Sequence, residues 1–204
     1  MSDSQRERTR LLPTRRRLLK STALAAGAYA LLPAPRVGAQ PRSLDYPLAT
    51  WEPATTANYT ASGPPEIRVP DLVVIHVTQA SYANTLAVFQ HPQKKVSAHY
   101  VVRSGDGHVA QCVREHDVAW HAGDWNHNLR SIGIEHEGWV DRPGYFTDAL
   151  YKKSARLTAT ICTRYGIPRD RAHIIGHYEV PGTDHTDPGP NWDWTRYIRL
   201  VNAA

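Results

Sequence analysis

Cysteine is scarce in this chain, whose 204 residues include only Cys112 and Cys162. Two cysteines permit one disulfide but do not require it. Cys112 lies in the alternating run HVAQCVR and Cys162 in the helical run LTATICTRYG, so we expect two buried free thiols. Neither cysteine opens a helix beside a basic partner, and neither is therefore predicted to act as a nucleophile.

The motifs of several enzyme classes are also missing. The sequence has no GxSxG, no GxxxxGK and no HxE paired with PCxxC. These absences argue against serine-hydrolase, P-loop and deaminase mechanisms. HExxH and CxxC, which place metal ligands on one element, are absent as well. Any metal site would have to gather its ligands from separate segments.

The positive charge of the chain is concentrated near its N-terminus. The formal net charge is +5, and residues 1–39 hold eight Lys or Arg against two acidic residues, a contribution of +6 that leaves about −1 for the remainder. The basic residues therefore indicate an N-terminal targeting segment, and we expect no nucleic-acid partner.

Residues 1–39 have the order of parts found in an export signal. A basic region precedes an apolar stretch at 23–32 that is too short to span a bilayer, and Val37-Gly38-Ala39 supplies small residues for cleavage. The segment TRRRLLK at 14–20 resembles a twin-arginine signal, with Leu18 where Phe is commoner. The alternative is a basic disordered tail. We expect cleavage after Ala39, no stable membrane insertion afterwards, and a periplasmic or secreted protein.

The remaining sequence predicts one α/β domain with a mixed central β-sheet flanked by helices. Residues 40–65 are rich in Pro, Thr, Ser and Ala without a regular period, which indicates an extended arm or linker before a packed domain at 66–204. Strands are predicted at 71–77, on either side of GDG at 105–107, at 131–138 and in HIIGH, with helices in YANTLAVFQ, FTDALYKKSARLTATICTRYG and WDWTRYIRLVN. Thr147 is the expected N-cap of the longest helix and Gly166 its stop. The hairpin at GDG excludes an all-parallel sheet.

Two histidines and one aspartate are candidate metal ligands. His76 and His177 end predicted strands, where α/β sheets usually place ligands, and Asp187 can fold back from a Pro/Gly-rich loop. Two imidazoles and one carboxylate with an open fourth position are typical of catalytic zinc. The alternative is that Asp187 only caps the turn at TDPGP and that His177 is an ordinary loop residue.

Glu135 is a candidate cleft residue. In the strand SIGIEHEG, Ile132 and Ile134 point one way, while Gly133, Glu135 and Glu137 point the other. A strand face with a small residue and carboxylates is expected to line a cleft.

Five motifs together resemble the zinc-dependent N-acetylmuramoyl-L-alanine amidases, the type 2 amidase family related to peptidoglycan recognition proteins and phage T7 lysozyme. They are VVIHVT, VSAHYVVRSGDGHVAQCV, AWHAG, NLRSIGIEHEG and GHYEVPGTDHTDPGPNWDW, and they run from about residue 70 to 200 in the family's order. The resemblance implies an amidase-like fold and one Zn²⁺ held by His76, His177 and Asp187. It also implies Glu135 as the catalytic carboxylate that acts on a water molecule.

The resemblance further implies peptidoglycan or muropeptides as the partner, cut at the amide between the lactyl group of MurNAc and L-Ala. It places Trp120, His121 and Asn128 along the substrate groove, although Trp120 could instead be packed beneath it. We expect a monomer. The alternatives are a peptidoglycan-binding module without hydrolysis and, more remotely, a zinc peptidase.

His185 departs from a common pattern of this family, which often has Lys two residues before the carboxylate ligand. In that place His185 could steady a developing oxyanion as an imidazolium or as a neutral N–H donor. It is therefore expected to be catalytic, with a surface role as the alternative. His99 either supports the metal site or simply packs in its strand, whereas Glu179 and Asp184 are expected to be solvated.

Overall fold

The structure is a computed structural model that describes residues 44–62 and 68–204. The predicted export signal at 1–39 lies outside the described residues. The strands are β1 (Thr50–Trp51), β2 (Tyr59–Thr60), β3 (Leu72–Val77), β4 (Tyr100–Val102), β5 (Val109–Gln111), β6 (Val118–Ala119), β7 (Ser131–His136) and β8 (Ile174–Gly176). The α-helices are α1 (Tyr82–Gln90), α2 (Trp125–Arg130), α3 (Asp148–Tyr165) and α4 (Trp194–Asn202), with short 3-10 turns η1 (Thr56–Asn58), η3 (Pro143–Tyr145) and η4 (His177–Glu179).

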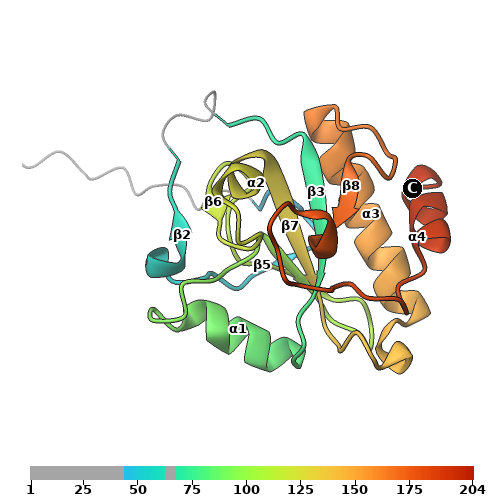
Figure 1. The fold of residues 1–204 in the computed structure, drawn as a ribbon, viewed down its shortest axis with the longest axis horizontal. Helices are drawn as coiled ribbons and strands as arrows, with labels where there is room; N and C mark the ends of the chain where they lie inside the picture. The colour runs from blue at the N-terminus through green and yellow to red at the C-terminus, as the bar shows by residue number, and fades with distance from the viewer. Residues whose placement is uncertain (1–43, 63–67) are drawn as a thin grey trace, which may run out of the picture. The chain divides into compact units, whose positions relative to one another are not determined.

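The main sheet is mixed and has the strand order β1-β5-β4-β7-β3-β8. β3 runs parallel to both β7 and β8, whereas β4 and β5 form the antiparallel hairpin that the GDG turn predicts. Gly107 in that turn has φ of 70°, a conformation that favours glycine. The predicted mixed α/β architecture is confirmed, and Figure 1 shows the strands at the centre with helices around them.

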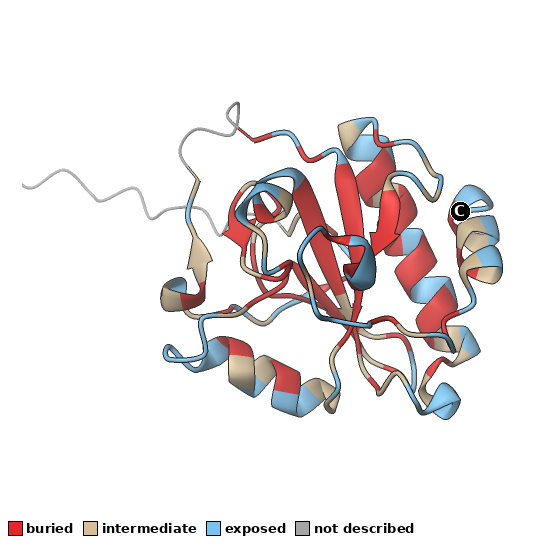
Figure 2. Ribbon diagram, viewed as in Figure 1, coloured by how far each residue is buried: buried red, intermediate tan, exposed pale blue. Residues whose placement is uncertain are grey.

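The two faces of the sheet have different roles. Val73 and Ile75 of β3, together with Ile132 and Ile134 of β7, pack in the main core with side chains of α3 and α4. Because side chains alternate along a strand, the next residues point to the other face, where β4 and β5 also pack against α1. Figure 2 shows these central strands buried and the outer sides of the helices exposed.

Local signals in the sequence account for the long helix that covers the core face. The Thr147 side chain accepts a hydrogen bond from the backbone N–H of Leu150 at 3.1 Å, as an N-cap does. Gly166 ends the helix in the left-handed region with φ of 69°. Both predicted ends of α3 are therefore confirmed.

Residues 44–62, part of the segment at 40–65 that is predicted to be an extended arm or linker, pack against the domain. β1 pairs with the edge of the main sheet through β5, and β2 pairs with β6. Tyr46 is 4% exposed and Asn58 is fully buried. The amide of Asn58 donates to the carbonyl oxygens of Phe89 and His91, which fastens the segment to the end of α1. Strands of two residues are too short to show a period of 2 in the sequence.

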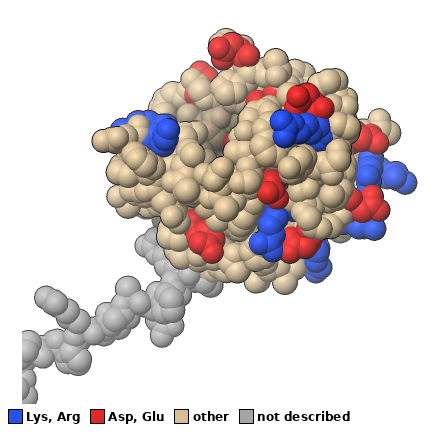
Figure 3. All heavy atoms as spheres, turned by 90° about the horizontal axis from the view of Figure 1, so that it is seen from below, with Lys and Arg blue, Asp and Glu red and all other residues tan. Residues whose placement is uncertain are grey.

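The described residues include two buried free cysteines and carry surface charges of both signs. Cys112 and Cys162 are free and buried, as predicted. In the described part of the chain, no helix has the length and apolar character that crossing a membrane requires. On the face shown in Figure 3, Lys and Arg are interspersed with Asp and Glu instead of forming a patch of one sign.

Candidate active site

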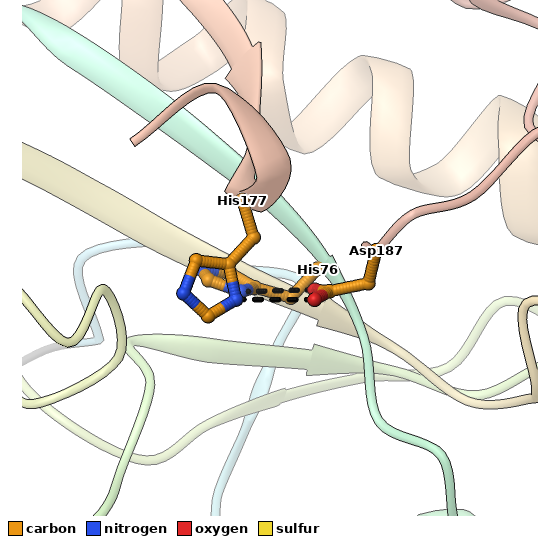
Figure 4. A group of neighbouring side chains, drawn as sticks. All are labelled: His76, His177 and Asp187. Carbon is orange, nitrogen blue, oxygen red and sulfur yellow. Dashed lines mark hydrogen bonds and ion pairs between the residues drawn. The ribbon is translucent and has the colours of Figure 1, made fainter. Parts of the chain in front are cut away.

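His76, His177 and Asp187 meet on the face of the sheet opposite to α3. His76 comes from β3, His177 begins η4 directly after β8, and Asp187 lies in the loop that leads toward α4. One possible ligand atom from each residue lies within 4.8 Å of the others, and all three residues are buried. Figure 4 shows both imidazole rings directed at the Asp187 carboxylate. The structure thus brings together the three residues that the sequence nominates as metal ligands.

The Asp187 carboxylate connects the two rings. Its Oδ2 lies 3.3 Å from His76 Nδ1, and its Oδ1 lies 3.1 Å from His177 Nδ1. The backbone N–H of Val77 also donates to Oδ2 at 3.2 Å. Burial by itself would raise the pKa of Asp187, but the hydrogen bonds to His177 and His76 lower it below its usual range. Burial lowers the pKa of His76, and the hydrogen bond and charge of Asp187 oppose this shift.

Glu135 lies beside this group because β3 and β7 are parallel neighbours in register. His76 and Glu135 are directly paired across the two strands, and both point to the same face. The Oε2 atom of Glu135 is buried and has no hydrogen-bond partner among the described residues. Desolvation, and secondarily the charge of Asp187, raise the pKa of Glu135 well above its ordinary value. An unpaired buried carboxyl oxygen at the edge of a cleft is a candidate proton carrier.

These residues line a single cleft of about 1000 Å³. Its walls include the three candidate ligands, Glu135, His185 and all three residues expected along a substrate groove, which are Trp120, His121 and Asn128. A volume of this size is typical of a ligand site that admits an extended molecule.

The three expected groove residues differ in what they contact. The Trp120 indole N–H donates to Thr60 Oγ1 at 3.0 Å, so its ring is anchored at the β2–β6 side of the cleft. The Asn128 side-chain oxygen accepts from the backbone N–H groups of His121 and Ala122 at 3.0 and 2.8 Å, which shapes the loop at 121–122. His121 is 6% exposed, and both of its ring nitrogens have partners inside the protein.

His185 stands at the mouth of the cleft. Its ring stacks on that of His177 with 4.1 Å between centroids, and its Nδ1 lies 3.5 Å from Asp187 Oδ1. With 60% of its side chain exposed, His185 is the accessible member of this group. This position leaves its ring free to face a molecule in the cleft.

Two other sequence expectations are resolved by contacts. His99 donates from Nε2 to the Asp117 carbonyl at 3.2 Å and accepts the backbone N–H of Gly133 at its Nδ1 at 3.0 Å, so it packs between strands and does not contact the candidate ligands. Glu179 is exposed, as predicted, and it also accepts the backbone N–H of Gly176 at 2.8 Å and pairs with Arg171. Glu179 therefore braces the turn that carries His177. A Glu three residues after a glycine N-cap is the signal that could have identified this contact.

The sequence of this chain is similar to those of known proteins. The family profile described as N-acetylmuramoyl-L-alanine amidase matches residues 66–190. The chain is 36% identical over 179 residues to N-acetylmuramoyl-L-alanine amidase A of Achromobacter lyticus, covering 79% of this chain and 98% of the relative.

Two solved structures share the fold. A selenomethionine derivative of AmpD aligns with a TM-score of 0.64 and 31% identity, covering 76% of this chain and 96% of the other. The amidase AmiD of E. coli, in complex with the substrate anhydro-N-acetylmuramic acid-L-Ala-D-gamma-Glu-L-Lys, aligns with a TM-score of 0.56 and 29% identity. That alignment covers 69% of this chain and 59% of AmiD.

Proposed function

This chain belongs to the N-acetylmuramoyl-L-alanine amidase family and has that activity, and we propose that it works with one zinc ion held by His76, His177 and Asp187. The bond cut is the amide between the lactyl group of MurNAc and L-Ala, in peptidoglycan or in muropeptides. The observation that carries the proposal is the convergence of these three side chains within 4.8 Å beside Glu135. A similar protein, AmiD, binds a muropeptide of this kind.

The donor set fits zinc. Two imidazole nitrogens and one carboxylate oxygen are the protein ligands of many catalytic zinc sites, and the described site contains no cysteine ligand of the structural type. A buried carboxylate that faces two ring nitrogens is also the arrangement that a divalent cation stabilises. Zinc held there would polarise the amide carbonyl and lower the pKa of water toward about 7.

Glu135 is proposed to carry the proton through the reaction. Its Oε2 accepts a proton from the attacking water as the water oxygen bonds to the lactyl carbonyl carbon. The same oxygen then returns that proton to the L-Ala nitrogen as the carbon–nitrogen bond breaks, which leaves a lactyl carboxylic acid that loses its own proton to the solvent and the free amine of L-Ala. A raised pKa makes the Glu135 carboxylate a stronger base toward water than a carboxylate of ordinary pKa. A pKa nearer the working pH lets the same group both take up the proton and give it back.

The remaining cleft residues are proposed to hold the substrate. Trp120 offers an apolar ring to the sugar or peptide, while Asn128 and His121 belong to the wall that faces it. His185 is proposed to donate an N–H to the oxygen that gains negative charge at the carbonyl. Its stacking on His177 and its exposed ring support this placement.

Digestion of purified sacculi and anhydro-muropeptides, with the products identified by mass, tests the proposal. Free stem peptides that begin with L-Ala should form, and a zinc chelator or Glu135→Gln should stop their formation. The matched control is Glu137→Gln, one residue beyond the end of β7, because Glu137 accepts backbone N–H groups of Tyr82 and Ser104 and has a structural role. Intact muropeptide that stays bound would indicate a binding module, and cleavage inside the stem would indicate a peptidase. Chelator-resistant release of stem peptides would contradict the zinc site.

We also propose that the chain is exported through a twin-arginine signal. The order of basic region, apolar stretch and small residues within 1–39 supports this proposal. The mature N-terminus should be Gln40, as read by mass spectrometry of the protein recovered from outside the cytoplasm. Replacing Arg15 and Arg16 by Lys should leave the precursor in the cytoplasm, and normal export of that variant would contradict the proposal.

A further inference from the structure

A line of three hydrogen bonds lies behind His76, on the side away from Asp187. His76 Nε2 is 2.9 Å from His121 Nδ1, and His121 Nε2 is 3.2 Å from Ser131 Oγ. Ser131 Oγ in turn bonds to the backbone carbonyl oxygen of His127 at 2.5 Å. Ser131 is fully buried, and His76 and His121 are 1% and 6% exposed, so water does not substitute for these partners.

The carbonyl oxygen at the end of the line sets the direction of every bond in it. A carbonyl only accepts, so the single hydroxyl hydrogen of Ser131 is donated to His127. Ser131 Oγ must then accept a hydrogen from His121 Nε2. From the other end of the line, a His76 that binds metal through Nδ1 carries its hydrogen on Nε2, and the partner of that atom is His121 Nδ1.

A neutral His121 with its hydrogen on Nε2 has a bare Nδ1, which accepts from His76 Nε2. With its hydrogen on Nε2, a metal-bound His76 presents the lone pair of Nδ1 on the side of Asp187, whose Oδ2 lies 3.3 Å from that atom. We propose that Ser131 and His121 are positioning residues that hold His76 in the tautomer and orientation needed to bind metal through Nδ1. The proposal rests on the metal site of the proposed function.

The second candidate ligand lacks such support, which makes the assignment specific to His76. His177 Nε2 is buried and has no hydrogen-bond partner among the described residues. A ligating histidine usually donates its other N–H to a carboxylate, carbonyl or water, and here a second imidazole takes that part for His76. The last acceptor in the line is the backbone carbonyl oxygen of His127, which does not titrate. The direction of the Ser131 hydrogen bond therefore does not depend on the protonation of a side chain.

The His121 ring packs closely against the backbone of β7 at Gly133. A Cβ on Gly133 would lie only 2.5 Å from His121 Cγ, so the ring occupies the space that a side chain would fill. The N–H of Gly133 is itself bonded to His99, which fixes the strand against which the ring rests. The ring is therefore held by packing as well as by its two hydrogen bonds.

NMR of the zinc-loaded chain tests the tautomers directly. Long-range ¹H–¹⁵N correlation of the imidazole rings should show His121 protonated at Nε2 only, and His76 protonated at Nε2 with its Nδ1 bare. His121 protonated at Nδ1, or a bare Nε2 on His76, would overturn the proposal.

Zinc affinity, measured by competition with a chromogenic chelator, tests the consequence. His121→Leu should weaken binding about 10- to 100-fold, and Ser131→Ala, one bond further away, about 10-fold. His121→Asn should recover part of the loss, because its side-chain oxygen can accept near the position of Nδ1. Equal losses in the Leu and Asn variants would show that His121 acts by packing alone and would overturn the proposal.

Ser154→Ala is the matched control. Ser154 is fully buried and bonds to another buried histidine, His136 Nε2, at 2.6 Å, but it does not touch the His76 ring. Its removal can lower the Tm while leaving the zinc Kd unchanged, and a loss of affinity equal to that of Ser131→Ala would overturn the proposal. A wild-type chain that binds no zinc would contradict the zinc site itself, whereas binding that tolerates His121→Leu would overturn only the positioning role.

Discussion

Gly133→Ala is the smallest substitution that tests how the site is supported. The added Cβ would lie 2.5 Å from Cγ of His121 and 2.7 Å from its Nδ1, whereas ordinary contact begins at 3.4 Å. The ring must therefore move by about 0.9 Å, the difference between 3.4 and 2.5 Å, or β7 must shift. Because the ring is bonded to His76 at 2.9 Å and to Ser131 at 3.2 Å, a movement of this size breaks at least one of these bonds.

The energetic cost has two parts. Overpacking a well-packed interior costs about 1–3 kcal/mol, and losing a buried hydrogen bond adds about 1 kcal/mol. The free energy of unfolding should therefore fall by about 2–4 kcal/mol, which lowers the Tm by about 5–15 °C in a domain of this size. The zinc Kd should rise about 10-fold, since the support of a metal ligand is disturbed.

Thermal unfolding of the metal-free chain and zinc competition measure these two effects separately. Gly105→Ala is the control, because nothing lies within 4 Å of a Cβ at that position and its φ is not in the left-handed region. It should be neutral or stabilising by up to about 1 kcal/mol. A Gly133→Ala chain with the wild-type Tm and zinc Kd would refute the view that Gly133 is required by the His121 ring.

Three further outcomes are expected. Glu135→Gln should lower kcat by about 10²- to 10⁴-fold without a loss of Tm. Glu137→Gln should lower the Tm and have a much smaller effect on kcat than Glu135→Gln; the opposite pattern would exchange the roles of the two residues. His185→Ala should lower kcat, and His185→Lys should restore much of it if a donor at this position steadies the oxyanion; equal rates for all three chains would remove His185 from the reaction. Burial lowers the pKa of His136 to about 3 from 6.5, so the unfolded chain binds the extra proton between these values. The stability that His136 contributes is thus complete above pH 6.5 and is lost as pH falls toward 3, by about 1.4 kcal/mol per pH unit, and urea unfolding with a flat pH dependence in this window would contradict it.

Much of the fold could be predicted because its elements carry local signals. β3 is an uninterrupted buried run, α3 has a threonine cap and a terminal glycine, and the β4–β5 hairpin has glycines at its turn. Each signal lies within a few residues of the element that it specifies. β1 and β2 escaped prediction because two-residue strands are defined by their partners alone.

The active-site residues were recognisable for a different reason. The alternation in SIGIEHEG indicated that Glu135 shares a face with Gly133, and the motif around TDPGP nominated Asp187 together with His177. Only the fold places Glu135 opposite His76, because the register between two strands far apart in the sequence is set by packing of the whole sheet.

By itself, then, the sequence determined the longer strands and helices, the family, and the side chains that converge on one cleft. The tertiary structure decided how those side chains are supported. Ser131 and His121 have no spacing that marks them as partners of His76, and Glu179 reads as a loop residue until its contacts with Gly176 and Arg171 are known. Hydrogen bonds between distant segments depend on orientation within fractions of an ångström, and that orientation exists only once the sheet, the helices and the returning loop have packed.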